Sequence, residues 1–338
     1  MIQVAADLRW PAGTGIGVVQ RELLSRRPTS VEVMNLNVHG RIGSPLSPIR
    51  VATALRQRGH ADVYWSPGFI PPLCSRVPAV VTVHDLTHLH YYSWLHKTYY
   101  STILRNLYKR CARIICVSAF TRDEFLQWSR MPPERTVVIH NGVSGKFHAA
   151  RASTQDKSGA YVLYPGNRRP YKNIRRLIQA YACSSLPRSG ISLLLTGAED
   201  SGTRDFARQE SVSQYVRFAG TLDDDALVRA YRNALAVAFV SLYEGFGLPL
   251  IEAMSSGVPV LCSNRASLPE IACDAALIVD PVSVTDIARG LERVCLDSKV
   301  RDGLIAAGFS RAQHFSWDRA AELTWRVVEE SAVRKGKE

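Results

Sequence analysis

The sequence predicts an α/β protein built from two Rossmann-like domains in series. Short apolar runs alternate with longer helical patterns, and a polar segment at residues 147–160 interrupts the alternation. Several of the short runs are apolar almost throughout, as expected of parallel strands that helices cover on both faces. The length of 338 residues also favours two domains over one.

The same strand–helix unit repeats on both sides of the polar segment. Strands are expected at 2–7, 61–67, 79–85, 113–118, 136–141, 160–166, 191–197, 215–220, 235–241, 258–263 and 275–280. Helices are expected at 15–26, 97–111, 118–128, 173–183, 202–210, 223–233, 249–256 and 284–295. Repeats of this kind are typical of doubly wound folds, which bind ligands beyond the carboxyl ends of their strands. Two such domains facing each other would form a deep cleft.

Net charge is concentrated in the first half of the chain. Residues 1–150 carry 18 Lys and Arg against 8 Asp and Glu, a balance of +10, whereas residues 151–338 carry 24 against 22, a balance of +2. This asymmetry predicts an anionic partner: a membrane face, a phosphorylated or lipid-linked acceptor, or nucleic acid. No apolar run approaches a membrane span and no signal peptide is visible, so a cytoplasmic protein is expected. The seven dispersed cysteines fit reduced thiols.

Two loops of the first half carry candidate ligand-binding residues. Gly15 and Gly17 lie at the start of the predicted helix 15–26, where they allow either close approach of an anionic ligand or tight packing of the turn. His84 and Asp85 end a strand, and a histidine there can donate a hydrogen bond or act as a general acid or base. His88 and His90 do not complete a familiar zinc set, so no metal site is expected.

A basic loop opens the second half. Arg168, Arg169 and Lys172 follow a strand that ends near Gly166, and Asn173 is expected to cap the next helix. Cations beside a helix N-terminus favour phosphate binding. The alternative is that the arginines are only solvated.

The segment "SLYEGFGLPLIEAMSSG" (241–257) carries two glutamates with seven residues between them. Pro249 fits the first position of a helix that Gly257 closes. Glu244 then lies in the loop, and Glu252 is expected in the first helical turn, where the helix dipole favours a carboxylate. The run Asp223–Asp225 is expected to start a helix rather than to bind a metal.

An ordered set of motifs resembles a known family along almost the whole chain. The motifs are "GTGIG" (13–17), "VTVHDLTHL" (81–89), "VSAFTRDE" (117–124), "VVIHNGV" (137–143), "YPGNRRPYKNIRRLIQAY" (164–181), "VRFAGTLDDDALVRAYRNA" (216–234) and "SLYEGFGLPLIEAMSSGVPVLCSNRASLPEIACDAALIVDP" (241–281). The chain thereby resembles a retaining glycosyltransferase of the GT-B fold, family 4 (group 1), in its mannosyltransferase-like branch.

The resemblance implies a domain for each substrate. Residues 1–150 would form the acceptor-binding domain and residues 151–315 the nucleotide-sugar-binding domain. Residues 316–338 would form a C-terminal helix that packs back on the N-terminal domain.

The resemblance also implies site residues. Glu244 would face the donor sugar, Glu252 would accept hydrogen bonds from the ribose hydroxyls, and Lys172 would neutralise the diphosphate. The remaining donor-site matches are His84 near the sugar, Gly15 and Gly17 at the diphosphate, the loop Gly245, Phe246, Gly247 and Leu248 at sugar and phosphate, and Thr221 and Leu222 at the base. Where many relatives have a phosphate-binding arginine this chain has Asn167, and Arg168 follows it.

The expected reaction is transfer of a hexose from a nucleotide sugar, GDP-mannose or a related GDP-deoxyhexose, to a lipid-linked or polysaccharide acceptor, without a metal cofactor. A UDP- or dTDP-sugar transferase keeps the same fold, as would an epimerase or phosphorylase. The alternative outside the enzymes is a basic protein that binds nucleic acid or membranes without catalysis. For the glycosyltransferase, no nucleic-acid partner is expected.

The basic helical segment at 94–113 is the candidate for a peripheral membrane contact. It mixes aromatic and aliphatic side chains with Lys97, Arg105, Lys109 and Arg110, as do helices that lie on an anionic membrane. A packed helix with a solvated basic face is the alternative. Asp85 is also expected to lie at the acceptor-binding site of the N-terminal domain.

Overall fold

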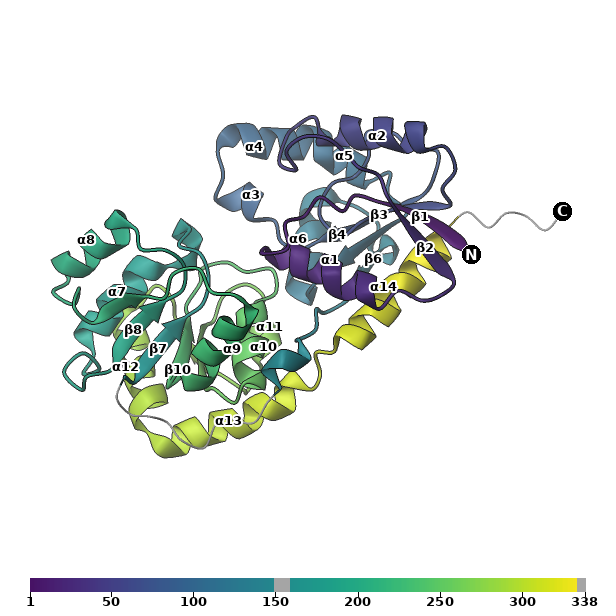
Figure 1. Cartoon of the computed structure of the whole chain (residues 1–338). Coiled ribbons are helices and arrows are strands. Elements are labelled where there is room, and N and C mark those ends of the chain that lie inside the picture. The colour runs from purple at the N-terminus through teal and green to yellow at the C-terminus, as the bar shows by residue number, and fades with distance from the viewer. Residues whose placement is uncertain (149–158, 333–338) are drawn as a thin grey trace. The chain divides into compact units, whose positions relative to one another are not determined.

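The computed structural model describes residues 1–148 and 159–332, and the chain forms two compact units (Figure 1). Unit 1 comprises Met1–Gly142 and Ser316–Glu338, and unit 2 comprises Val143–Phe315. The boundary expected between residues 150 and 151 lies outside the described residues. Each unit contains a six-stranded parallel sheet with helices packed on it, so the predicted fold class is confirmed.

The sheet of unit 1 has the strand order β2-β1-β3-β4-β5-β6. Its strands are β1 (Ile2–Ala6), β2 (Val31–Asn35), β3 (Val63–Ser66), β4 (Ala79–Val83), β5 (Arg113–Cys116) and β6 (Thr136–Val138). Its helices are α1 (Gly15–Ser25), α2 (Ser47–Arg58), α3 (Thr87–His90), α4 (Trp94–Tyr99), α5 (Arg105–Tyr108), α6 (Ala119–Ser129) and α14 (Trp317–Ser331), with a π-helical turn η1 (Tyr100–Leu104) between α4 and α5 and a 3₁₀ turn η2 (Pro133–Arg135).

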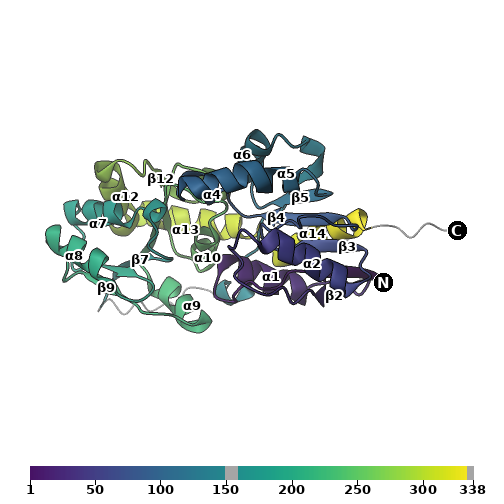
Figure 2. The same cartoon turned by 90° about the horizontal axis from the view of Figure 1, so that it is seen from above.

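Helix α14 joins unit 1 from the far end of the sequence. It lies against α1 and the strands β3, β4 and β5, and both views show it beside this sheet (Figure 1 and Figure 2). The ring of Trp325 packs on Trp65 with 4.8 Å between centroids, and its Nε1 donates to the Leu23 carbonyl at 3.0 Å. Arg26 also pairs with Asp318 at 2.6 Å. These contacts make the C-terminal helix part of the core of unit 1.

The sheet of unit 2 has the strand order β12-β11-β10-β7-β8-β9. Its strands are β7 (Tyr161–Tyr164), β8 (Ser192–Leu195), β9 (Val216–Phe218), β10 (Ala236–Phe239), β11 (Val260–Ser263) and β12 (Leu277–Val279). Its helices are α7 (Ile174–Cys183), α8 (Ser201–Gln209), α9 (Asp224–Asn233), α10 (Leu248–Ser255), α11 (Leu268–Ala272), α12 (Val284–Leu296) and α13 (Ser298–Ala312), with 3₁₀ turns η3 (Gly145–Phe147) and η4 (Pro170–Lys172).

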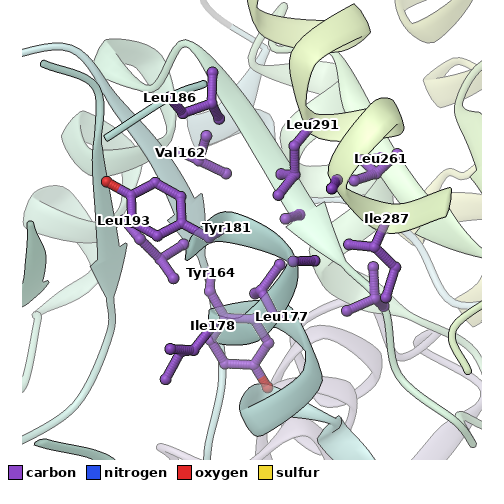
Figure 3. Packing of buried hydrophobic residues seen from close by; sticks show 14 of the residues in the cluster. Val162, Tyr164, Leu177, Ile178, Tyr181, Leu186, Leu193, Leu261, Ile287 and Leu291 are labelled. Atoms are coloured by element: carbon purple, nitrogen blue, oxygen red, sulfur yellow. The ribbon is translucent and has the colours of Figure 1, made fainter. Parts of the chain in front are cut away.

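Helices α7 and α12 close one face of the unit 2 sheet. Figure 3 shows Leu177 and Ile178 of α7 close to Tyr164 of β7, with Ile287 and Leu291 of α12 in the same cluster. All five side chains are fully buried. Strand β10 gives alternate residues to this core, so its other residues face α10, which lies against β10 and β11 and is covered by α13.

The elements missing from the sequence prediction have weak patterns. Strand β2 (VEVMN) lies at the sheet edge and buries only Val31, and its apolar residues are interrupted by Glu32, so it lacks the continuous apolar run of a central strand. Helix α13 buries little beyond Gly308 and Ala312, which give no apolar stripe. Helices α2, α3 and α11 were also not predicted, and α3 and α11 are single short turns. Short or weakly amphipathic elements take their conformation from tertiary packing.

Two helical glycines allow a test of the packing on the unit 2 sheet. A β-carbon on buried Gly290 of α12 would lie 2.6 Å from Leu261 and 2.8 Å from Val279, whereas one on Gly303 of α13 would meet nothing within 4 Å. We expect Gly290→Ala to lower the free energy of unfolding by about 1–3 kcal/mol through overpacking. Gly303→Ala should raise it by about 0.5–1 kcal/mol through helix propensity. Denaturant unfolding of both variants checks the prediction, and a stabilised Gly290→Ala would contradict it.

Candidate active site

The centre of the unit 2 sheet is a topological switch point. Strands β7 and β10 are neighbours, and the chain continues from them in opposite directions, to β8 and β9 on one side and to β11 and β12 on the other. Ligands of open α/β sheets bind beyond the carboxyl ends of the strands at such a point. The loops that follow β7 and β10 therefore meet where a ligand site is expected, and the Leu242 amide donates to the Tyr171 carbonyl at 2.8 Å between them.

An ion pair joins these two loops. Lys172 Nζ lies 2.6 Å from Glu244 Oε1, and the side chains are only 13% and 12% exposed. The ammonium group also lies over the rings of Tyr171 and Phe239, at 5.5 and 5.3 Å from their centroids. The structure thus brings together the two charged residues that the sequence predicted for the sugar and the diphosphate.

Asn173 forms a second link between the two loops. Its Nδ2 donates to the Val240 carbonyl at 3.0 Å and to the Pro281 carbonyl at 2.7 Å. The expected side-chain cap on α7 is therefore wrong, because the side chain makes no capping bond and points to the ends of neighbouring strands. Its backbone is left-handed, with φ of 63°.

Ser267 and Gly247 fix the loop that carries Glu244. The buried Ser267 hydroxyl lies 2.9 Å from the Glu244 carbonyl oxygen and 3.1 Å from that of Phe246. Gly247 has φ of 99°, and a β-carbon there would lie 2.8 Å from Leu268. The ring of Phe246 packs edge-on against Phe315 at 5.7 Å. A loop held in this way presents its backbone in one conformation at the start of α10.

Helix α10 begins and ends nearly as predicted. Pro249 lies in its first turn, and Gly257, with φ of 69°, closes it. The Gly257 amide donates to Met254 and the Val258 amide to Ala253, which is a Schellman motif.

The position predicted for Glu252 within α10 is wrong. The helix starts at Leu248, which makes Glu252 its fifth residue, beyond the first turn. The helix dipole therefore does not explain this carboxylate. Instead, Tyr231 Oη of α9 donates to Glu252 Oε2 at 2.7 Å. Burial raises the pKa of the Glu252 carboxyl to about 7; the hydrogen bond from Tyr231 opposes this shift, and the charge of Asp224 adds to it.

Arg168 binds protein groups around the end of β8. Its guanidinium lies 2.6 Å from Asp200 and 2.7 Å from the Thr196 carbonyl, bonds the Ala198 carbonyl, and lies over the Phe218 ring. This arrangement ties the loop after β7 to the loop after β8 and to the last residue of β9. A phosphate contact of Arg168 stays a prediction and would require it to leave these partners.

Asn167 shapes its own loop. Its Oδ1 accepts from the Arg169 amide at 3.3 Å, and its carbonyl accepts from the Tyr164 hydroxyl at 2.8 Å.

Thr221 and Leu222, predicted to hold the base, lie between β9 and α9. The preceding Gly220 has φ of 70° and pairs with Gly197 across the sheet end. Asp223 then caps α9, accepting from the Ala226 amide at 2.7 Å. The interpretation of 223–225 as a helix start is confirmed. Base binding by the Thr221–Leu222 backbone stays a prediction.

Unit 1 places its predicted residues at the carboxyl ends of β1 and β4. Gly15 starts α1 and is exposed, whereas a β-carbon on Gly17 would collide with the Pro11 carbonyl. The Gly17 amide donates to Thr14, so packing and capping explain this glycine. A substrate contact of either glycine stays a prediction.

His84 and Asp85 both bond within unit 1. His84 Nε2 lies 2.7 Å from the Pro67 carbonyl, so this nitrogen carries the proton, and burial lowers the pKa of the ring. Asp85 accepts from the amide and the hydroxyl of Thr87 at the start of α3. Their roles toward substrates stay predictions.

His88 and His90 diverge. His88 stacks on Tyr100 with 3.4 Å between centroids and burial lowers its pKa to about 3, whereas His90 bonds Glu124. Among residues 1–148 and 159–332, no group of three or more His, Cys, Asp or Glu side chains is placed to hold a metal ion.

Two functional candidates of the site carry no signal in the sequence. Ser267 lies inside the motif at 241–281, but a serine in a loop gives no sign of the two carbonyls it contacts. Tyr231 lies on the buried face of α9, where an aromatic residue is expected to be core. Only its hydrogen bond to Glu252 distinguishes Tyr231 from an ordinary core residue.

Comparisons with known proteins agree with this geometry. The family model "Glycosyltransferase Family 4" matches residues 14–146, and the model "Glycosyl transferases group 1" matches residues 147–311. O-antigen chain mannosyltransferase B of Escherichia coli is 32% identical over 318 residues, which cover 89% of this chain and 80% of that protein. O-antigen chain mannosyltransferase RfbU of Salmonella typhimurium is 29% identical over 60% of this chain and 56% of its own.

Solved structures show the same fold at lower identity. WaaG, a glycosyltransferase involved in lipopolysaccharide biosynthesis, has a TM-score of 0.76 and 14% identity over 97% of this chain and 99% of its own. Anabaena HepE, solved in complex with UDP-glucose, has a TM-score of 0.76 and 17% identity over 98% of this chain and all of its own.

The chain belongs to the group 1, or family 4, glycosyltransferases and has the GT-B fold. It is a glycosyltransferase, and its relatives include mannosyltransferases of O-antigen synthesis.

The two glutamates should respond oppositely to removal of charge. The raised pKa of Glu252 contributes stability below the unfolded value near 4.5, and this contribution is lost as pH rises through about 7. We therefore expect the difference in free energy of unfolding between Glu252→Gln and the unsubstituted protein to shift by about 1–3 kcal/mol in favour of the variant when the pH is raised from 5 to 8. Glu244→Gln, which leaves Lys172 without its ion-pair partner, should lose about 3 kcal/mol. Denaturant unfolding at both pH values measures these differences, and an unchanged difference for Glu252→Gln would contradict the assignment.

Proposed function

We propose that the protein is a retaining hexosyltransferase that uses a GDP-linked sugar, GDP-mannose or a related deoxyhexose. The acceptor in this proposal is a lipid-linked oligosaccharide or polysaccharide of the cell surface. The Lys172–Glu244 pair at the switch point of unit 2 is the observation that carries the donor-site assignment. The choice of mannose rests on the relatives named as O-antigen mannosyltransferases.

The leaving group sets the electrostatic demand on this site. Cleavage of the bond between the sugar and a nucleoside diphosphate leaves negative charge on the diphosphate and positive charge on the anomeric carbon. Lys172 supplies a cation, and the backbone of Gly245–Leu248 supplies amide dipoles at the start of α10. Groups already oriented toward developing charge lower the barrier without reorganisation.

Glu244 is proposed to act on the sugar. Its carboxylate lies beside Lys172, where the sugar and the diphosphate of one donor would be adjacent. There it can bond sugar hydroxyls and stabilise positive charge near the anomeric carbon. Glu252, on the helix that follows, is proposed to accept hydrogen bonds from the ribose hydroxyls.

The reaction is proposed to need no metal ion. The charge that a divalent cation would neutralise is met here by Lys172 and the N-terminal amides of α10. Activity in excess EDTA should therefore match activity with added magnesium.

A donor panel tests the proposal. We expect GDP-mannose or a GDP-deoxyhexose to be the preferred donor, with membrane extract as acceptor and nucleoside diphosphate release as readout. Lys172→Ala should lower kcat/KM at least about 100-fold, because it removes charge stabilisation from the transition state. Lys299→Ala, an exposed lysine of α13, is the matched control and should have no effect. A preference for UDP- or dTDP-sugars would replace the GDP assignment, and full activity of Lys172→Ala would overturn the site.

The acceptor side of the proposal concerns the surface of α4 and α2 in unit 1. Among the described residues, no helix is both long and apolar enough to cross a membrane. Trp94 and Leu95 are nevertheless 70% and 60% exposed, and Leu46 and Ile49 are also exposed. Tyr99 Oη donates to the Pro45 carbonyl at 2.9 Å, which ties the end of α4 to the segment just before α2.

We propose that this surface binds an anionic membrane that carries the acceptor. Tyr100, Leu104 and Tyr108 bury the other side of the segment, so it is both a packed helix and an exposed apolar one. Lys97, Lys109 and Arg110 are exposed. Arg105 is partly buried and donates to the Ser129 carbonyl at 3.3 Å, so it is the least suited of the four predicted basic residues to meet lipid.

Vesicle flotation tests the membrane contact. Vesicles with anionic lipid should carry the protein upward, and the triple change Lys97→Gln, Lys109→Gln, Arg110→Gln should abolish this, because each cation near the surface contributes about 1 kcal/mol. Trp94→Ala with Leu95→Ala should weaken flotation without a change in charge. The matched control removes three exposed cations of unit 2, as Arg188→Gln, Arg217→Gln and Lys299→Gln. If both triple variants lose flotation equally, membrane binding depends only on the net charge of the protein, and the proposed docking surface is contradicted.

A further inference from the structure

We propose that Tyr231 is a positioning residue for donor binding, and that its hydroxyl holds the Glu252 carboxylate in the orientation that receives the ribose. The inference rests on the proposed function of Glu252. Tyr231 lies on α9, outside the loops and the helix that carry the predicted donor contacts. Its role would be to act on the nucleotide through Glu252.

The tyrosine is fixed at its hydroxyl end by one contact. Tyr231 is fully buried, and its Oη donates to Glu252 Oε2 at 2.7 Å. Glu252 itself is only partly buried and belongs to the neighbouring helix α10. A glutamate side chain has several rotatable bonds, and this hydrogen bond restricts them.

The ring of Tyr231 also contacts η3. Phe147 packs edge-on against the Tyr231 ring, with 5.5 Å between centroids and 88° between planes. Two polar contacts hold η3 to the same helix: Lys146 Nζ pairs with Asp224 at 2.9 Å, and Arg232 donates to the Lys146 carbonyl at 2.8 Å. These contacts hold Phe147 against the Tyr231 ring.

A carboxylate held in this way is ready to accept from a diol. It has about four acceptor positions, and one is used by Tyr231. Because the carboxylate is already ordered, a ligand that bonds the remaining positions pays less of the entropy of ordering it. The two ribose hydroxyls are donors of the kind that such a carboxylate binds.

The same hydroxyl favours the ionised carboxylate. The groups that face Glu252 are Tyr231 and Asp224 from α9, with Lys146 of η3 paired to Asp224. Burial and Asp224 raise the pKa of Glu252, and the Tyr231 hydroxyl opposes them. Removal of the hydroxyl should therefore move the ionisation of Glu252 to higher pH and weaken nucleotide binding at neutral pH.

Tyr231→Phe is the direct test, because it removes the hydroxyl and keeps the ring against Phe147. The probes are GDP and 2′,3′-dideoxy-GDP, with UDP and its dideoxy analogue in parallel, and calorimetry measures their Kd. We expect about tenfold weaker binding of the ribonucleotide, as for loss of a hydrogen bond to a charged group, and no change for the dideoxy nucleotide. The donor KM should rise by a similar factor with kcat nearly unchanged. The midpoint of the pH dependence of binding should shift upward.

Matched variants separate the possible failures. Tyr181→Phe removes a buried hydroxyl that donates to the Ile191 carbonyl at 2.6 Å, far from Glu252 in the sequence and on another helix, and should leave Kd unchanged. Combined with Glu252→Gln, Tyr231→Phe should have no further effect on Kd. If Glu252→Gln alone leaves ribonucleotide binding intact, the proposed function of Glu252 fails. If it weakens binding but Tyr231→Phe does not, or if Tyr231→Phe weakens the dideoxy nucleotide equally, the role of Tyr231 is overturned.

Discussion

The ion pair between Lys172 and Glu244 is the interaction on which the rest of the unit 2 site depends. Two charges that are nearly out of water stabilise the fold only when their geometry is well held. Here the sheet holds it: β7 and β10 are hydrogen-bonded neighbours, and each supplies the loop that carries one member of the pair. The Leu242 amide and the Asn173 side chain add bonds between those same loops. The position of both charges is thus a consequence of strand order.

Both side-chain and backbone features fix the conformation of the loop that carries Glu244. The Ser267 hydroxyl lies within hydrogen-bond distance of the carbonyls of Glu244 and Phe246, and the Ser267 amide donates to the first at 3.4 Å, so one residue anchors both ends of the loop. Gly247 then turns the chain into α10 through a left-handed conformation that a larger residue would strain. The amides at the start of α10 are consequently displayed in one arrangement, as electrostatic stabilisation of a leaving group requires.

Most strands and helices could be predicted because their apolar patterns are local, as in β10, where all four residues are buried. The loop positions of Lys172 and Glu244 followed from the ends of those strands. What failed depended on partners distant in sequence. Asn173 is a good capping residue in isolation, but Val240 and Pro281 take its amide. Glu252 was predicted in the first turn of its helix because Pro249 marked the helix start. The helix begins one residue earlier, at Leu248, and the partner of Glu252 is the Tyr231 hydroxyl. No local pattern predicts that Arg168 meets Asp200.

The contrast between the two glutamates defines what each can do. Glu244 has an ammonium group as its partner, so its charge is already balanced in the protein. Glu252 has a neutral hydroxyl as its partner and Asp224 as a neighbouring charge, so ionisation there is opposed. A carboxylate of the first kind suits a place beside developing positive charge, because the ammonium group of Lys172 already holds it in position. One of the second kind suits uncharged donors such as sugar hydroxyls, which bond it without adding charge. Eight positions along the chain therefore separate two carboxylates with different chemistry, and the difference comes from β7 and α9 rather than from the segment that contains them.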